Sequence, residues 1–248
     1  MVSRSKRKIL ELLFPPRCPV CDRLLDTVEI RKEQSIHRKC ADRLYPVGEG
    51  HCLHCGRPID SEQAEYCFDC IQKQKKASPS FYVQGKSIFV YQGDIKKTMY
   101  RFKYSNRREY ALFFAEEAKK RYEDWIARCG IEAVIPVPMY KKKEKRRGYN
   151  QAKLFAEKLA ELLDLPYEPE ALRRVRDTKP QKELDEAQRK INLKNAFQAA
   201  DFVVKYNCIL LVDDIYTTGC TVETAAQTLE SAGVDHVYIL TVCIGKGF

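Results

Sequence analysis

The feature that most constrains the fold of this chain is the run Ile209–Thr221, which reads ILLVDDIYTTGCT. Four apolar residues are typical of a buried strand, two aspartates follow at its carboxyl end, and a threonine- and glycine-rich turn leads into a helical pattern. Ligands of open α/β sheets bind at the carboxyl ends of the strands, where the first turn of a helix offers free N–H groups and a positive dipole end. The run therefore predicts an α/β domain with a phosphate-holding segment. The simpler alternative is a strand, turn and helix with an acidic N-cap.

Each residue type in this run suits a sugar phosphate. Glycine lets the backbone approach a ligand closely, and threonine hydroxyls add hydrogen-bond donors. The predicted phosphate cradle comprises Thr217, Thr218, Gly219, Cys220 and Thr221. Carboxylates only accept hydrogen bonds, so Asp213 and Asp214 suit ribose hydroxyls, or Mg²⁺ held together with the sugar.

Strands and helices are expected to alternate in the second part of the chain. Apolar runs predict strands at Ser87–Tyr91, Glu132–Pro138, Cys208–Val212 and Val237–Ile244. Periodic apolar positions predict helices at Glu109–Arg128, Gln151–Leu163 and Thr221–Ala232. This alternation indicates a mainly parallel sheet flanked by helices. The polar stretch Lys73–Ser80 is typical of a linker, so we expect one domain over residues 1–80 and a second over residues 81–248.

Cysteines are concentrated in the first domain, which holds seven of the eleven. Two Cys-x-x-Cys pairs predict a four-thiolate zinc ribbon, because two intervening residues let one tight turn point both sulfurs at the same ion. An earlier Cys-x-x-Cys followed by His-x-x-Cys suits a second zinc ion. The expected ligand sets are Cys52, Cys55, Cys67 and Cys70, and Cys18, Cys21, His37 and Cys40. Gly56 and Asp22, each directly after a pair, suit the left-handed backbone of such a turn.

The set Cys18, Cys21, His37 and Cys40 has the weaker pattern, because its second half lacks a Cys-x-x-Cys pair. A lone histidine is more often a surface or packing residue than a ligand, so the chain is expected to hold one or two zinc ions. The two sites can also exchange ligands in an interleaved arrangement, which the spacing leaves open.

The charge of the chain favours a negatively charged partner. The formal net charge is +10, which suits nucleic acid or a polyphosphate as well as a merely solvated basic surface. No apolar run approaches the roughly 18 residues that a membrane span needs, and the basic N-terminus lacks the long apolar region of a secretory signal. We therefore expect a cytoplasmic protein without membrane insertion, in which paired cysteines bind metal rather than form disulfides.

The run Ile209–Thr221 resembles, at every position, the phosphoribosyl pyrophosphate (PRPP) motif of type I phosphoribosyltransferases. With a ribbon first and a phosphoribosyl domain second, nearly the whole chain resembles the ComF family, known for its link to DNA uptake in competent bacteria. Its further matches are Phe102-Lys103-Tyr104, Val137-Pro138, Arg147-Gly148-Tyr149-Asn150-Gln151, and Thr178-Lys179-Pro180-Gln181 with Arg189, Asn192 and Phe197. The chain departs from the expected pattern at His37 and Cys40, where a cysteine pair is expected.

The resemblance implies a type I phosphoribosyltransferase fold and a second half of the site. In phosphoribosyltransferases the loop after the strand that here ends at Pro138 holds pyrophosphate, which assigns Arg146, Arg147 and Gly148 to that role. Lys103 is counted with the ligand-binding residues, as are Lys179 and Arg189 in the expected flap Arg173–Phe197. The basic run Lys141–Arg147 is equally suited to a DNA backbone, or to a solvated surface.

Two functions compete at this point. The first is a PRPP-binding accessory protein of DNA uptake, whose zinc-ribbon and basic surfaces contact single-stranded DNA. Other DNA-uptake proteins are its further expected partners. The second is a metabolic enzyme of the glycosyltransferase class that moves phosphoribose from PRPP, or a related ribose 5-phosphate compound, to an amine or nucleobase. In that enzyme Asp213 and Asp214 are the expected catalytic residues, and Mg²⁺ accompanies the pyrophosphate.

Overall fold

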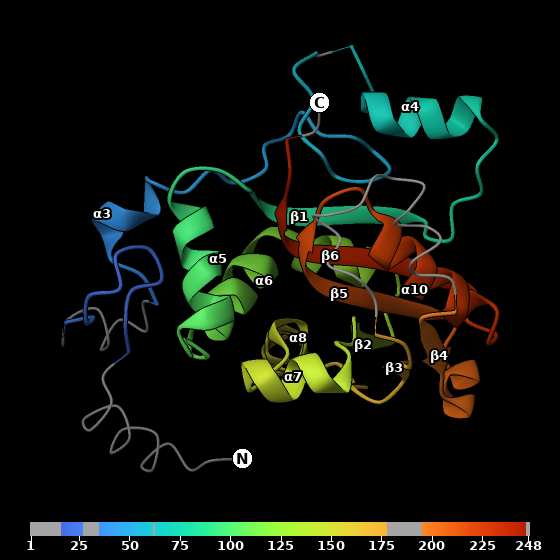
Figure 1. The fold of residues 1–248 in the computed structure, drawn as a ribbon. Coiled ribbons are helices and arrows are strands. Elements are labelled where there is room, and N and C mark those ends of the chain that lie inside the picture. Colours follow the sequence, from blue (N-terminus) through green and yellow to red (C-terminus); the bar gives the residue numbers. More distant parts are fainter. Residues whose placement is uncertain (1–15, 27–34, 62, 178–194, 247–248) are drawn as a thin grey trace.

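Four parallel strands form the central sheet, in the order β1–β6–β5–β2 (Figure 1). These strands are β1 (Gln84–Val90), β2 (Ala133–Pro136), β5 (Cys208–Tyr216) and β6 (His236–Ile244). A separate antiparallel pair consists of β3 (Leu172–Arg174) and β4 (Phe197–Ala199). The computed structural model describes residues 16–26, 35–61, 63–177 and 195–246. The predicted parallel sheet flanked by helices is confirmed.

Helices cover both faces of the sheet. α5 (Asp94–Tyr104), α6 (Tyr110–Arg128) and α8 (Gln151–Leu163) pack on one face, and α10 (Cys220–Glu230) packs on the other. Successive residues of a strand point to opposite faces, so Leu210 and Val212 belong to the first core, while Ile209 and Leu211 belong to the second. The four apolar residues of β5 are therefore buried from both sides, which is why this run carries no alternation.

Three expectations about local structure are corrected. β5 does not end at Val212 but continues to Tyr216, because β6 goes on pairing with it, including Asp213 with Thr241. The basic run forms a helix, α7 (Lys141–Arg147), and not a loop. α4 (Phe68–Lys75) includes the first residues of the expected linker. Lys, Arg, Glu and Gln are good helix formers, and this propensity prevails in both basic segments.

The two cysteine-containing segments pack at different places on the second domain. The first, with α3 (Arg38–Ala41), lies beside α5, where Thr98 and Arg101 donate hydrogen bonds to the carbonyls of Pro19 and Val20 (Figure 1). The second lies along β1, where the Gly85 N–H donates to the His54 carbonyl at 2.6 Å. A short 3₁₀ helix, η2 (Asp201–Lys205), precedes β5. No helix of the described residues has both the length and the apolar character to cross a membrane.

Candidate metal centres and phosphate site

The second cysteine segment brings four thiols into one buried cluster. The sulfur atoms of Cys52, Cys55, Cys67 and Cys70 all lie within 4.8 Å of one another. Cys55 and Cys67 are 3.6 Å apart at their sulfurs. Tetrahedral zinc with bonds of about 2.3 Å places two thiolate sulfurs about 3.8 Å apart. The donor set and its spacing therefore fit a structural Zn²⁺ ion.

Crowding of these thiols also indicates a cation. Hydrogen bonds from Cys55, Cys67 and Cys70 lower the pKa of Cys52, so the thiolate form is favoured there. Hydrogen bonds within the same cluster, above all with Cys52, raise the pKa of Cys70. One thiolate thus disfavours the next, and a bound Zn²⁺ ion would offset this effect because its positive charge favours the thiolate form of each ligand.

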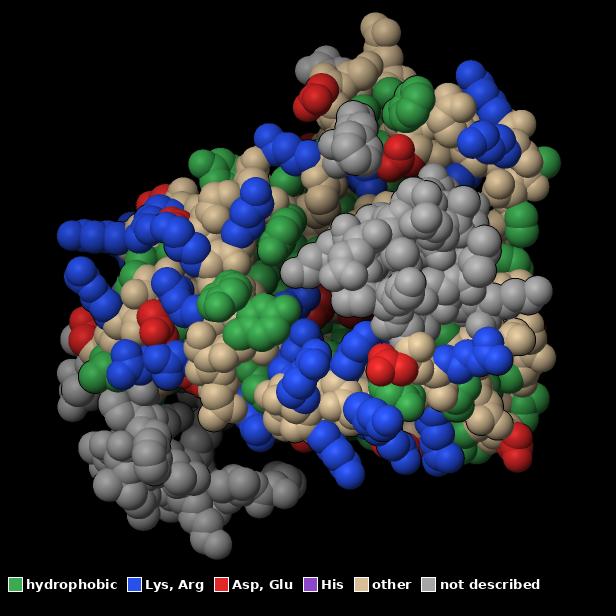
Figure 2. All heavy atoms as spheres, viewed as in Figure 1, with side chains coloured by type: hydrophobic (Ala, Val, Ile, Leu, Met, Phe, Trp, Pro, Cys, Tyr) green, Lys and Arg blue, Asp and Glu red, His purple; other side chains and the backbone are tan. Residues whose placement is uncertain are grey.

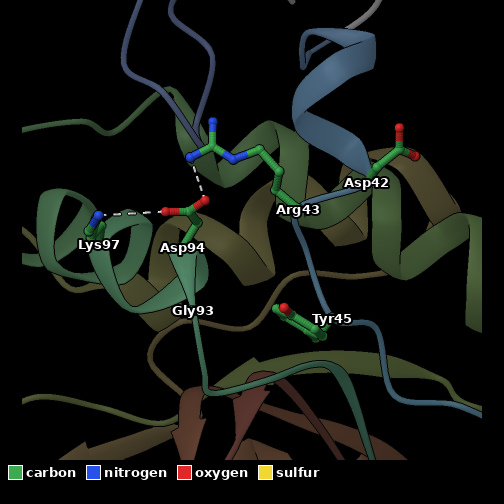
Figure 3. Close-up of a pocket in the computed structure, with 6 residues that line it drawn as sticks. All are labelled: Asp42, Arg43, Tyr45, Gly93, Asp94 and Lys97. Carbon is green, nitrogen blue, oxygen red and sulfur yellow. Dashed lines mark ion pairs between the residues drawn. The ribbon is translucent and has the colours of Figure 1, made fainter.

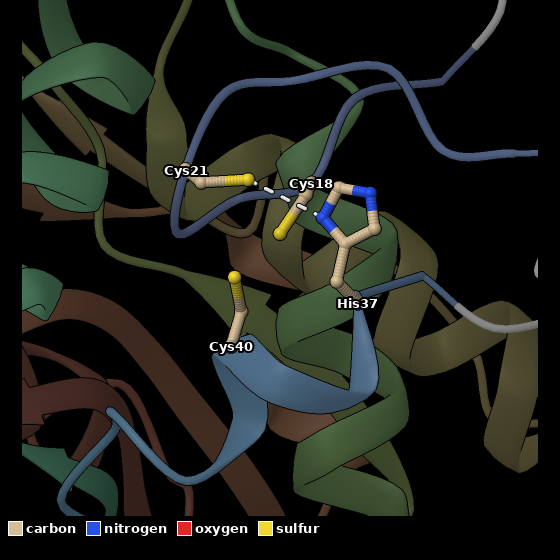
Figure 4. Close-up of side chains that lie close together, drawn as sticks. All are labelled: Cys18, Cys21, His37 and Cys40. Carbon is tan, nitrogen blue, oxygen red and sulfur yellow. Dashed lines mark hydrogen bonds between the residues drawn. The ribbon is translucent and has the colours of Figure 1, made fainter.

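The first cysteine segment forms the first metal centre, with three thiols and one imidazole, and Figure 4 shows these groups converging on one space. The four-thiol cluster is the second metal centre. His37 lies with its Nδ1 3.3 Å from the sulfur of Cys21, while its Nε2 is 3.1 Å from the Leu24 carbonyl. A ligating histidine usually donates its other ring N–H in this way, which fixes the ring orientation. The four groups fit tetrahedral Zn²⁺ with His37 binding through Nδ1.

Both clusters have the predicted membership. The remaining described histidines near them, His51 and His54, lie outside the two groups, and the ligands are not interleaved. Gly56 has φ +74° and Asp22 has φ +60°, so the left-handed turn expected after each Cys-x-x-Cys pair is confirmed. The turns after Cys18-x-x-Cys21 and Cys52-x-x-Cys55 therefore have the same left-handed backbone conformation, with Asp22 in the first and Gly56 in the second.

A small, shallow pocket with a cavity volume of about 10 Å³ lies at the carboxyl end of β5. It is lined by Asp213, Ile215, Tyr216, Thr217, Gly219, Thr221 and Val222. The Asp213 carboxylate accepts the N–H of Asp214 at 2.7 Å. Burial, and then the charge of Asp214, raise the pKa of Asp213 to about 7. This carboxyl group therefore exchanges its proton near neutral pH, and a ligand or cation that favours the carboxylate shifts that balance.

The neighbouring Asp214 lies on the other face of the sheet, because the two aspartates are consecutive residues of one strand. Its carboxylate pairs with the Lys103 ammonium of α5 at 2.9 Å, and both side chains are less than 20% exposed. Burial lowers the pKa of Lys103, but the Asp214 charge outweighs it, and the net shift is upward. The structure thus brings Lys103 to the predicted site, and it separates two carboxylates that the sequence placed together.

The turn between β5 and α10 depends on Gly219. This residue is the N-cap of α10 with φ +83°, and a Cβ there would lie 2.3 Å from the Tyr216 hydroxyl. Cys220 is buried and its sulfur accepts the Thr218 hydroxyl at 3.3 Å, so its N–H, not its thiol, is what the turn offers a ligand. Of the predicted cradle residues, Thr217 and Thr218 lie in the turn, Gly219 is the N-cap, and Cys220 and Thr221 begin α10, so free N–H groups at the start of this helix face the turn.

The basic helix α7 contributes unequally to this region. The Arg147 guanidinium lies 5.1 Å from the ring centre of Tyr104 and donates to the Gln151 amide oxygen at 2.8 Å, which places it beside Lys103. Arg146 is exposed, and Gly148 ends the helix with φ +90°. Two further candidates, Lys179 and Arg189, lie outside the described residues. Their assignment to pyrophosphate stays a prediction.

Sequence reasoning missed the residues that join the second metal centre to the turn between β5 and α10. Arg57, only 5% exposed, donates to the Asp69 carboxylate at 2.6 Å and to the Thr217 carbonyl at 2.7 Å. Glu223 of α10 pairs with Lys73 of α4 at 3.3 Å. The Tyr82 and Tyr216 hydroxyls lie 3.0 Å apart. The only early signal was the placement of Arg57 directly after Gly56, inside a metal-binding turn.

A larger hollow, about 420 Å³, opens between the first cysteine segment and the start of α5 (Figure 3). Its charged groups are engaged with one another, since Asp94 pairs with Arg43 at 2.5 Å and with Lys97 at 3.7 Å. It too lies at a helix N-terminus, that of α5, but the Asp94 carboxylate and its two cationic partners already occupy that position. The β5 pocket is therefore the better candidate for a phosphate ligand.

The fold and its sites define a class of protein: an α/β domain with a parallel sheet, a glycine-containing strand–helix turn at an acidic strand end, and two thiolate-rich centres that fit zinc. Residues 9–71 match the family model of the double zinc ribbon domain. The geometry of the two cysteine clusters and the family match therefore both indicate a double zinc ribbon in the N-terminal region.

Comparison with characterised proteins extends the match to most of the chain. Competence protein F of Haemophilus influenzae is 33% identical over 204 residues, covering 76% of this chain and 82% of that protein. DNA utilization protein YhgH of Salmonella typhi is 31% identical over 199 residues, covering 77% and 83%. Competence protein ComFC of Bacillus subtilis is 27% identical over 205 residues, covering 82% and 81%. The chain belongs to the ComF family, as its motifs predicted.

Proposed function

We propose that this chain binds PRPP, or a related ribose 5-phosphate compound, at the carboxyl end of β5. The observation that carries the proposal is the pocket in which Asp213 faces the first turn of α10. The phosphate is held by the N–H groups of Thr217–Thr221, where backbone donors and the helix dipole act together. The Asp213 carboxylate accepts hydrogen bonds from the ribose hydroxyls. The Asp214 carboxylate can accept further hydrogen bonds from them when the Lys103 ammonium turns from Asp214 toward the ligand.

Magnesium is part of this proposal as a companion of the pyrophosphate. Carboxylate oxygens and phosphate oxygens are the donors that Mg²⁺ prefers, and Asp213 provides the former in the pocket. The cations Lys103 and Arg147, close to each other beside Asp214, offset the remaining charge of the diphosphate. Arginine also grips phosphate oxygens as a fork, which suits the role assigned to Arg147.

We also propose that the chain acts in DNA uptake and contacts single-stranded DNA. Its relatives carry the names competence protein and DNA utilization protein. The net charge of +10 favours a polyanionic partner. Because its relatives are named competence proteins, we also expect it to bind other proteins of DNA uptake. Two centres that require reduced thiols suit a cytoplasmic location.

Calorimetric titration with PRPP, with and without Mg²⁺, tests the central claim. Saturable binding that weakens when Mg²⁺ is withdrawn supports it, whereas no heat of binding to the zinc-loaded protein contradicts it. A parallel assay of pyrophosphate release with amines and nucleobases as acceptors tests the alternative, a metabolic phosphoribosyltransferase. Turnover with one acceptor selects the enzyme, and tight binding without release selects the accessory protein.

A further inference from the structure

Two tyrosines of α5 are exposed beside the candidate phosphate site. Tyr100 is 63% exposed and Tyr104 is 55% exposed. They lie one helical turn apart, with ring centroids 5.1 Å apart and ring planes inclined by 51°. The other large side chains of this helix, Met99 and Phe102, are fully buried, so α5 has one face in the core and one aromatic face in solvent.

Unpaired positive charge adjoins this aromatic face. The Arg147 guanidinium lies 5.1 Å from the ring centre of Tyr104, so the C-terminal end of α7 lies beside the tyrosine pair. α7 contains six basic residues and one acid, and none of its residues is buried. Within the described ranges, five of these six cations form no ion pair: Lys141, Lys142, Lys145, Arg146 and Arg147. Figure 2 shows Lys and Arg side chains gathered over α7 beside hydrophobic side chains over α5.

We propose that this α5–α7 face, defined as Tyr100, Tyr104 and the basic residues of α7, is a stacking platform for single-stranded nucleic acid. Unpaired bases stack on the two tyrosines, and the backbone phosphates run along α7. The combination decides the class of partner. An acidic protein surface would use the cations but not the rings, and a duplex keeps its bases stacked on one another and out of reach.

The platform also fixes where the strand lies relative to the proposed PRPP pocket. Lys103, between the two tyrosines in α5, points toward the sheet and pairs with Asp214, while the rings point away from it. One helix therefore serves both sites, and a base on Tyr104 lies next to the acidic end of β5. The inference rests on the DNA-contacting part of the proposed function, and it adds the surface and the mode of contact.

A protein–ligand double-mutant cycle tests the stacking directly. Fluorescence titrations compare the affinity of the protein for a labelled oligothymidine of about 20 nucleotides with its affinity for an abasic strand of the same length and charge. Wild-type protein is expected to prefer the base-containing strand by about tenfold or more, because each stacked base contributes substantially to affinity. Tyr100→Ala/Tyr104→Ala should bind both strands equally, at the affinity of wild type for the abasic strand. Tyr100→Phe/Tyr104→Phe keeps the rings and should keep the preference.

Salt dependence separates the aromatic half of the platform from the basic half. Lys142→Gln/Arg146→Gln should lower the slope of log affinity against log salt by about 1.4, since each lost phosphate contact in a single strand removes about 0.7. The tyrosine variants should leave that slope unchanged. Phe202→Ala, which removes an exposed ring from η2 at another part of the surface, is the matched control and should change neither quantity.

Each outcome decides a different claim. If the alanine variant still prefers the base-containing strand, or wild type binds a matched duplex as tightly, the platform is wrong and the proposed function stands. If wild type binds no oligonucleotide even at low salt, the platform and the DNA part of the proposed function both fail. PRPP titration of the same samples then reports whether the phosphoribosyl part holds, and thermal unfolding confirms that every variant is folded.

Discussion

The Arg57 guanidinium donates a hydrogen bond of 2.7 Å to the carbonyl oxygen of Thr217. Arg57 belongs to the turn that carries Cys52 and Cys55, and Thr217 opens the turn that we propose binds phosphate. The same guanidinium pairs with Asp69, between Cys67 and Cys70, so it contacts both knuckles of the metal centre. Arg57 therefore joins the second metal centre to the turn between β5 and α10, the turn that we propose binds phosphate.

Substitution of Arg57 should weaken PRPP binding while leaving zinc in place. Arg57→Met keeps the apolar stem but removes a charge-assisted hydrogen bond, a loss of about 1.5–3 kcal/mol, so affinity is expected to fall about tenfold or more. Calorimetric titration measures this change. The matched control is Arg43→Met, which breaks an ion pair in the other cysteine segment and should leave PRPP affinity unchanged. Equal affinity of Arg57→Met and wild type would show that the turn holds its shape without Arg57.

Metal analysis should find two zinc ions per chain. The cysteine segments themselves contribute few large apolar side chains to the two cores, mainly Val20, Leu25, Leu44 and Val47, so metal binding contributes much of their stability. His37→Ala should lose one ion, and Cys67→Ser should lose the other. Because Arg57 depends on the second centre, only Cys67→Ser should also weaken PRPP binding. A zinc content near zero in a protein with a folded N-terminal domain would contradict the assignment of both centres.

The two aspartates are expected to be essential for PRPP binding but not for folding. Asp213→Asn/Asp214→Asn keeps side-chain size and removes the charge, so affinity should fall about tenfold or more. Asp213→Asn alone should account for most of the loss, since Asp213 lines the pocket and Asp214 is engaged by Lys103. Titration of the double variant and of each single variant measures this. Unchanged affinity in the folded double variant would place the sugar elsewhere.

Stability should depend on pH through Asp213. Its pKa rises from the ordinary value of 3.8 to about 7 on folding, so between these values the folded state holds a proton that the unfolded state has released. Stability from this group is thus lost as the pH rises toward 7. Asp213→Asn removes the loss and should be more stable than wild type at pH 8, by about 1–2 kcal/mol, with the difference vanishing near pH 4.

Urea unfolding at both pH values provides the measurement. The asparagine can still accept the Asp214 N–H through its Oδ1, so the local turn is preserved. If the Asp213→Asn variant is less stable than wild type at pH 8, folding does not raise the pKa of Asp213 as expected.

Local pattern was sufficient for the features that depend on neighbours in the chain. The spacing of Cys52 and Cys55, and the left-handed residue Gly56 after them, predicted a metal-binding turn because two intervening residues determine its geometry. The apolar run of β5 predicted a doubly covered strand because burial on both faces requires it. The Lys, Arg and Glu content of Lys141–Arg147 also favours the helix α7 that forms there, whereas the family resemblance predicts a pyrophosphate loop.

Tertiary structure alone decided how the parts of the site meet. Pairing with β6 extended β5 through Asp213 and Asp214, and strand alternation then sent the two carboxylates to opposite faces. Packing of α5 brought Lys103 to Asp214, and the second metal centre brought Arg57 to Thr217 across 160 residues of sequence. The sequence by itself determined the chemistry of each segment. The contacts between segments depend on the packing of the whole chain, which no local propensity encodes.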